Sequence, residues 1–241
     1  YYFDNEKWDD ALKHFDVVIA GDNLRLKGFG LYKGGWCYFR KGNILMAINY
    51  LKKIIESRAQ LVDADNKKSK LRFEKEAIRD LVVFFAELGA TSQAINWFRS
   101  VVPKSWRIYV EKMAYYYSDK GFRTQAIEIF RYLIREMPTH PKAFDYQYQI
   151  VMNQLNSAKD QVFRGEMFTW IVDYDVNGTW GKANAGNKEA LEKSYKLREA
   201  ALRSYVLQQH QNAQNSKGQY SQINAREGYE LYLKKFADSS Q

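Results

Sequence analysis

Eight apolar or small residues recur at closely matching spacing in three consecutive segments of this 241-residue chain. Small residues, Gly or Ala, occupy positions where two helices would approach closely, and larger apolar residues recur at helical spacing. The pattern therefore predicts two short amphipathic helices joined by a tight turn, repeated along the chain. The three copies are Leu31, Gly34, Gly35, Tyr38, Gly42, Ala47, Leu51 and Ile54; Ile78, Leu81, Val82, Phe85, Gly89, Ala94, Phe98 and Val101; and Val110, Met113, Ala114, Tyr117, Gly121, Ala126, Phe130 and Leu133.

A partial copy precedes the three full ones. Ala11 lies 36 residues before Ala47, and Trp8, Phe15 and Val18 share its predicted helix. Because the chain begins inside a repeat, we expect it to be a fragment of a longer protein that lacks its native N-terminus, with any signal peptide or lipid anchor. At the other end of the pattern, Pro138 follows the second helix of the third full copy, where a helix must stop.

The repeated pattern resembles the tetratricopeptide repeat (TPR), a helix–turn–helix unit of about 34 residues. The resemblance covers residues 1–138. It implies an all-α fold, namely a right-handed α-solenoid of antiparallel helix pairs, or TPR-like superhelix. It also implies that the first helix of each copy lines a concave inner surface. Arrays of this kind mostly bind other proteins, so the resemblance implies a non-catalytic interaction scaffold that binds a peptide or protein segment in its groove.

The pattern divides the chain into segments of one continuous array. The anchor alanines Ala47 and Ala94 are 47 residues apart, whereas the steps on either side are 36 and 32 residues, so the long step contains an insertion. Asn187 is a plausible N-cap for a long helix that runs to about His210. The predicted segments are the second helix of a partial TPR (1–25), a TPR (26–60), a charged insertion (61–70), two TPRs (71–104 and 105–140), a degenerate TPR (141–174), a loop rich in Gly and Asn (175–186), and a long helix with a terminal TPR-like helix (187–241).

The first helices assign the inner face residue by residue. Where chaperone-binding TPR relatives hold a terminal carboxylate with Lys and Asn, this chain has Tyr32, Trp36, Arg79 and Tyr115, so we expect no carboxylate clamp. Aromatic residues beside Arg favour a peptide with apolar side chains and some negative charge. A second interpretation is that Trp36 and Phe39 fill the gap to the first partial copy. The predicted groove residues are Phe29, Tyr32, Trp36, Arg40, Arg79, Val83, Glu111 and Tyr115, and the degenerate copy adds Lys142, Asp145, Gln149 and Met152.

The net charge of +9 is uneven along the chain. Residues 40–79 contain eleven Lys or Arg and five Asp or Glu, a local excess of +6. This region is either an electropositive patch for an acidic peptide, nucleic acid or an anionic surface, or a solvated helix face with a charged loop. Aromatic residues mostly occupy packing positions and do not alternate with basic ones, so binding to nucleic acid is the alternative function.

Residues with catalytic or metal-binding chemistry form no known motif. His14, His140 and His210 are far apart in the sequence, and the chain has no glycine-rich phosphate loop, nucleophile elbow or HExxH stretch. Asp63 and Asp65 alternate as calcium ligands do, but the Gly and downstream Glu of a binding loop are missing. We therefore expect no enzyme activity, no cofactor and no metal. An alternative is that the array presents a substrate to a catalytic domain outside this chain.

Compartment and further partners follow from weaker signals. The longest apolar run, Leu81–Ala86, is far shorter than the roughly 20 residues of a membrane span. The single cysteine, Cys37, is expected to be a small core residue instead of a reactive thiol. The ending YLKKFADSS resembles repeats of bacterial envelope proteins, which implies the periplasm or envelope, with the cytoplasm as the alternative. Self-association through the terminal helices is a further expectation.

Overall fold

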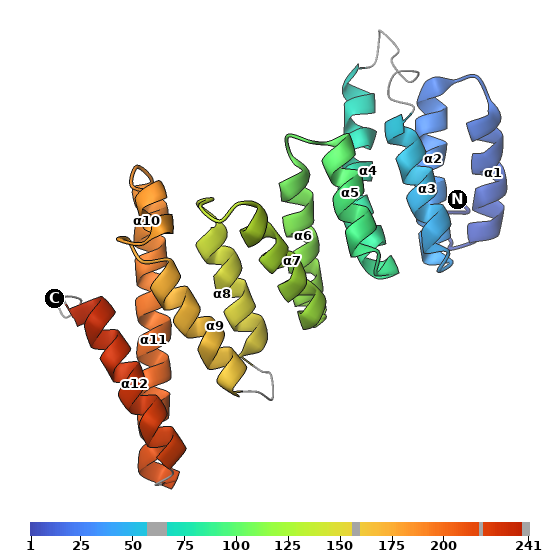
Figure 1. Cartoon of the computed structure of the whole chain (residues 1–241). Coiled ribbons are helices and arrows are strands. Elements are labelled where there is room, and N and C mark those ends of the chain that lie inside the picture. Colours follow the sequence, from blue (N-terminus) through green and yellow to red (C-terminus); the bar gives the residue numbers. More distant parts are fainter. Residues whose placement is uncertain (57–66, 156–159, 217–218, 238–241) are drawn as a thin grey trace. The chain divides into compact units, whose positions relative to one another are not determined.

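The computed structural model describes residues 1–56, 67–155, 160–216 and 219–237, and its regular secondary structure there is entirely helical. This confirms the all-α prediction. The twelve α-helices of the described ranges are α1 (Trp8–Ala20), α2 (Leu24–Arg40), α3 (Ile44–Glu56), α4 (Lys67–Leu88), α5 (Thr91–Val101), α6 (Trp106–Asp119), α7 (Arg123–Glu136), α8 (Ala143–Gln154), α9 (Asp160–Asp173), α10 (Thr179–Ala183), α11 (Lys188–Ser216) and α12 (Gln219–Phe236) (Figure 1). They form two compact units, residues 1–121 and residues 122–241.

In the first unit, each helix packs against the next along the chain, from α1 through α6. The predicted first helices of the full copies also contact one another, α2 with α4 and α4 with α6. The anchor alanines lie where the pattern placed them, since Ala47 and Ala94 are fully buried. Cys37 is also fully buried, and burial raises the pKa of its thiol to about 11. Because the thiolate is the reactive form, the raised pKa makes Cys37 unreactive. Its burial agrees with the prediction of a small core residue.

The helix pairs share one turn geometry. The repeat glycines Gly42, Gly89 and Gly121 all have positive φ, at 77°, 71° and 78°. After Gly42, the Asn43 backbone N–H donates to the Tyr38 carbonyl at 2.9 Å, the hydrogen bond of a Schellman cap. The pattern predicted glycine at the turn, and the structure shows that the left-handed backbone is the reason.

The same turn occurs in the partial copy with a residue other than glycine. Glu6 lies 36 residues before Gly42 and has a φ of 57°. The Lys7 backbone N–H donates to the Tyr2 carbonyl at 3.0 Å, as Asn43 does to Tyr38. The partial copy therefore begins with the same left-handed turn that joins the two helices of a full copy.

Substitutions at Glu6 and at its counterpart Gly42 should change the stability of the first unit in opposite directions. We expect Glu6→Gly to stabilise the first unit by about 0.5–1 kcal/mol, because a side chain in the left-handed region costs more than the chain entropy of glycine. Gly42→Ala should destabilise it by about 1 kcal/mol, since a Cβ there meets no other atom within 4 Å and only the backbone conformation opposes it. Urea unfolding measures both. Glu6→Ala is the control, and equal stabilisation by it would contradict the backbone explanation.

In the second unit, sequential packing runs from α7 to α8 and from α8 to α9, and α11 packs against α9 and α12. Its core contains Phe144 of α8, Trp170 of α9, Leu202 of α11 and Phe236 of α12. Arg198 of α11 is also buried and donates to the Ile171 carbonyl at 2.7 Å. No helix in the described ranges combines the length and the apolar character needed to cross a bilayer.

Three predicted segments differ in detail. The predicted loop at 175–186 is only partly correct, because it contains the short helix α10, whose Trp180 is buried and donates from Nε1 to the His140 carbonyl at 2.9 Å. The predicted cap at Asn187 is confirmed by a hydrogen bond from the Ala190 backbone N–H to its side chain, but α11 continues to Ser216. Of the predicted insertion, residues 67–70 belong to α4, and residues 61–66 lie outside the described ranges.

Candidate functional site

The predicted groove residues lie on α2, α4 and α6, which contact one another in that order. Their accessibility differs. Phe29 is 38% exposed, and Arg40 and Arg79 are exposed. The half-buried members of the set are Tyr32, Trp36, Val83 and Tyr115, whereas Glu111 is buried. The structure therefore presents part of the predicted set on the surface and uses the rest between helices.

A buried carboxylate holds two of the predicted residues. Asp80 of α4, which is 8% exposed, accepts hydrogen bonds from the Tyr32 hydroxyl at 2.6 Å and from Trp36 Nε1 at 3.1 Å. The Arg79 Nε donates to its other oxygen at 3.4 Å. Burial and the hydrogen bond to Asp80 raise the pKa of Tyr32 to about 12. These contacts fix α2 against α4 and orient the rings of Tyr32 and Trp36.

Asp80 was missed by the sequence analysis, although a signal was present. It stands between Ile78 and Leu81, on a run of apolar residues in which a charged side chain needs a partner. An acid at that place indicates buried hydrogen-bond donors nearby. The repeat pattern recorded only apolar and small positions, so this polar contact between copies was not predicted.

Aromatic packing settles the alternative interpretation of Trp36 and Phe39. The Trp36 ring lies 5.1 Å from the Phe84 ring, edge to face, and Phe39 stacks on Phe84 at 4.3 Å. Both rings therefore pack against α4 of the following copy, whereas the second interpretation had assigned them to the gap to the first partial copy. Offset and edge-to-face aromatic pairs of this kind add to the stability of the helix contact.

Two other predicted residues are engaged in local contacts. Glu111 is 7% exposed and forms an ion pair with Arg107 at 3.5 Å, one turn earlier on α6. Arg40 stays exposed, with its guanidinium 5.9 Å from the centre of the Trp36 ring. Glu111 thus contributes to helix packing, while Arg40 combines with Phe29 and Arg79 as accessible groups of the face formed by α2, α4 and α6, which we call the α2–α4–α6 face.

Several basic residues of region 40–79 cover other side chains. Lys41 forms an ion pair with Asp9. Lys52 lies 5.2 Å from the centre of the Phe85 ring, and Lys53 lies 5.5 Å from that of Tyr50. These contacts favour packing and surface pairing as the role of Lys41, Lys52 and Lys53. The side chains of residues 67–72 lie outside what the structure describes.

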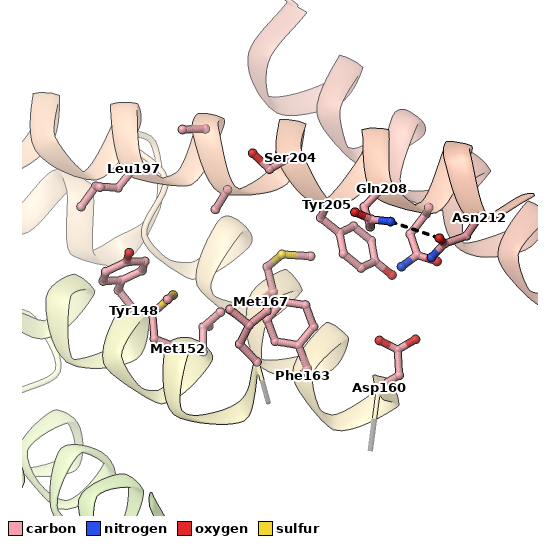
Figure 2. Close-up of a pocket in the computed structure, with 15 residues that line it drawn as sticks. Tyr148, Met152, Asp160, Phe163, Met167, Leu197, Ser204, Tyr205, Gln208 and Asn212 are labelled. Carbon is pink, nitrogen blue, oxygen red and sulfur yellow. Dashed lines mark hydrogen bonds between the residues drawn. The ribbon is translucent and has the colours of Figure 1, made fainter. Parts of the chain in front are cut away.

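A cavity of about 600 Å³ lies in the second unit between α8, α9 and α11 (Figure 2). Met152, which the sequence analysis assigned to the inner face of the degenerate copy, lines it together with Met167 and Phe163. The remaining lining residues are Tyr148, Val151, Leu155, Asp160, Leu197, Ala200, Ala201, Ser204, Tyr205, Gln208, Gln209 and Asn212. Its size and mostly apolar lining are typical of small-molecule sites between helices.

Polar groups gather at one end of this cavity. Figure 2 shows Asp160, Gln208 and Asn212 near the Tyr205 hydroxyl, and Tyr148 and Leu197 at the opposite end. The Gln208 amide donates to the Asn212 side chain at 3.1 Å. Tyr205 is 7% exposed, and its hydroxyl has no hydrogen bond of acceptable geometry within the described part of the chain. Burial raises the pKa of this phenol to about 12, against the opposing charge of Arg164.

The cavity could not be predicted from the repeat pattern. It needs α9 and α11, which are separated in the chain by the segment that contains α10.

Among the described residues, no group of three or more His, Cys, Asp or Glu is arranged to hold a metal ion. Comparisons of the chain with protein-family models, with curated proteins and with solved structures found no match.

Proposed function

We propose that this chain is a TPR-like, non-catalytic scaffold, and that its α2–α4–α6 face binds a segment of a partner protein. The observation that carries the proposal is the exposure of Phe29 and Arg40 on α2 and of Arg79 on α4, two helices that contact each other. Aromatic and Arg side chains are the common anchors of protein interfaces, because the ring offers a large rigid contact area and the guanidinium offers directional charge.

The surface chemistry specifies the partner segment. Arg40 and Arg79 favour acidic groups, and Arg is suited to pairing with a carboxylate through two hydrogen bonds. Phe29 contacts the rings of Phe15 and Phe73, so an apolar side chain of the partner would extend an existing aromatic cluster. We therefore expect a segment with Asp or Glu near one or two apolar residues. The proposed compartment is the bacterial periplasm or envelope, and the proposed mechanism needs no cofactor.

Selection of peptides from a displayed random library tests this function. We expect enrichment of peptides that combine apolar and acidic residues. Their affinity should fall about tenfold in the double variant Arg40→Glu, Arg79→Glu, since each exposed ion pair contributes up to about 1 kcal/mol and about 1.4 kcal/mol corresponds to tenfold. Because Arg79 also donates to the buried Asp80, Arg79→Gln with Arg40→Glu is a second variant that places no new carboxylate there, and circular dichroism and urea unfolding measure the folding of both variants.

A matched control carries the same change in net charge on other helices. Lys13 of α1 and Lys53 of α3 are exposed, and the double variant Lys13→Glu, Lys53→Glu should keep the affinity for the selected peptides. An equal loss of affinity in both double variants would mean that only the net charge of the chain matters for peptide binding. If no peptide is enriched, or if binding is unchanged in the arginine variant, the α2–α4–α6 face is not the binding site. Binding of RNA or DNA to the chain at low salt, measured in a separate assay, would favour nucleic acid binding, the alternative function.

A further inference from the structure

We propose that the cavity between α8, α9 and α11 is a second binding site, whose ligand is a small organic cation with an apolar or aromatic body. The site lies in the second unit, so it is separate from the α2–α4–α6 face and does not depend on the proposed scaffold function. The proposal is based on the shape of the cavity, on its buried polar groups and on the sign of its charge.

The body of the ligand is specified by the apolar part of the lining. The rings of Tyr148 and Phe163 and the thioethers of Met152 and Met167 face a space of about 600 Å³. Aromatic rings and methionines offer large, adaptable contact area to a planar or flexible apolar group. A volume in this range accommodates a ligand of several fused or linked rings and exceeds what one partner side chain fills.

Buried polar groups at one end would orient the ligand. The Tyr205 hydroxyl is buried and makes no hydrogen bond of good geometry in the described chain, although the Arg164 guanidinium interacts with it. Gln209, also 7% exposed, lies four residues after Tyr205 on the same helix and lines the same cavity. A ligand that donates a hydrogen bond to the Tyr205 oxygen would satisfy this group.

The charge of the lining selects a cation. Among the described residues that line the cavity, Asp160 alone is charged, and it lies at the polar end. The nearby Arg164 does not reverse this sign, because its guanidinium is paired with Glu227 of α12 and lies 4.7 Å from the centre of the Phe168 ring. An ammonium group beside Asp160 would thus find a carboxylate and hydrogen-bond acceptors, and the Arg164 charge that acts on Tyr205 is offset by its ion pair with Glu227.

Three naphthyl probes of similar size test the charge preference. We expect 2-(1-naphthyl)ethylamine to bind and the uncharged 2-(1-naphthyl)ethanol to bind about fivefold more weakly. The anion 1-naphthaleneacetate should bind at least about tenfold more weakly than the amine, because the carboxylate of Asp160 attracts only the ammonium group. Isothermal titration calorimetry on the whole chain, with naphthyl fluorescence as a second readout, gives the three affinities.

Variants locate the binding site. Asp160→Asn should remove the difference between the amine and the alcohol, whereas Asp173→Asn, an exposed acid on the same helix but outside the cavity lining, should keep it. Ala201→Trp should weaken the binding of both probes at least about tenfold by occupying the apolar part of the cavity, and Ala200→Leu is a milder variant of the same kind if the first one melts early. The proposal is overturned if no probe binds up to millimolar concentration, if the acetate binds as well as the amine, or if both filling variants keep full affinity.

Discussion

Gly181→Ala is expected to destabilise the second unit by about 3 kcal/mol, the cost of overpacking a site that cannot relax. A Cβ at Gly181 would lie closer than 3.0 Å to the carbonyl oxygens of Asp175 and Val176. Both are backbone atoms, so the overlap cannot be relieved by a change of rotamer. Since α10 carries the buried Trp180, displacement of this helix would also pull an indole out of the core. Chemical denaturation measures the loss.

Gly186→Ala is the matched control for this prediction. It lies just after α10, and a Cβ there would have no other atom within 4 Å. We expect its effect to stay within about 0.5 kcal/mol, as for most surface substitutions. Similar unfolding midpoints for the two variants would mean that the loop carbonyls around Gly181 are not packed as the structure shows.

Arg198→Met is expected to destabilise the second unit by about 3 kcal/mol, because it leaves buried acceptors without donors. Arg198 is 2% exposed and donates to the Ile171 carbonyl of α9 and, from Nε, to the Ser194 hydroxyl at 3.1 Å. Its guanidinium also lies 5.6 Å from the centre of the Phe236 ring of α12. One side chain of α11 thus joins α9 and α12. Burial lowers the pKa of this guanidinium, which the Asp175 charge opposes.

Arg203→Met on the same helix is the control. Arg203 is exposed and pairs with Glu199 one turn away at 3.0 Å, so we expect a change below about 1 kcal/mol. A loss equal to that of Arg198→Met would show that the buried hydrogen bonds contribute nothing beyond a surface ion pair.

The pH dependence gives a second readout for Arg198. Burial alone would raise the pKa of Asp175, but the Asn177 backbone N–H together with Lys235 and Arg198 outweighs it and lowers that pKa. A carboxyl whose pKa is lowered by folding stabilises the protein fully above its unfolded value of about 3.9, and this stability is lost as pH falls through the lower, folded-state pKa. Acid unfolding below about pH 4 should therefore be less steep in Arg198→Met than in Arg203→Met.

The position of turns and core residues could be predicted because both depend on local chemistry. Gly42, Gly89 and Gly121 recur at one offset between two helices, where a left-handed turn favours glycine, and Ala47 and Ala94 allow close helix contact through their small volume. The turn at Glu6 was not predicted, because no glycine indicates it, although it lies 36 residues before Gly42. The superhelix implied by the resemblance stays a prediction.

The sequence by itself determined the class of fold, the register of the helix pairs and the burial of their apolar faces, since helical periodicity and turn conformation are properties of short segments. Only the tertiary structure decided which polar groups meet. The carboxylate of Asp80 meets Tyr32 and Trp36 across 44 to 48 residues of chain, and the cavity of the second unit combines Met152 with Tyr205. Such hydrogen bonds and cavities depend on side chains from distant segments of the chain, and a repeat pattern does not specify which of these side chains contact one another.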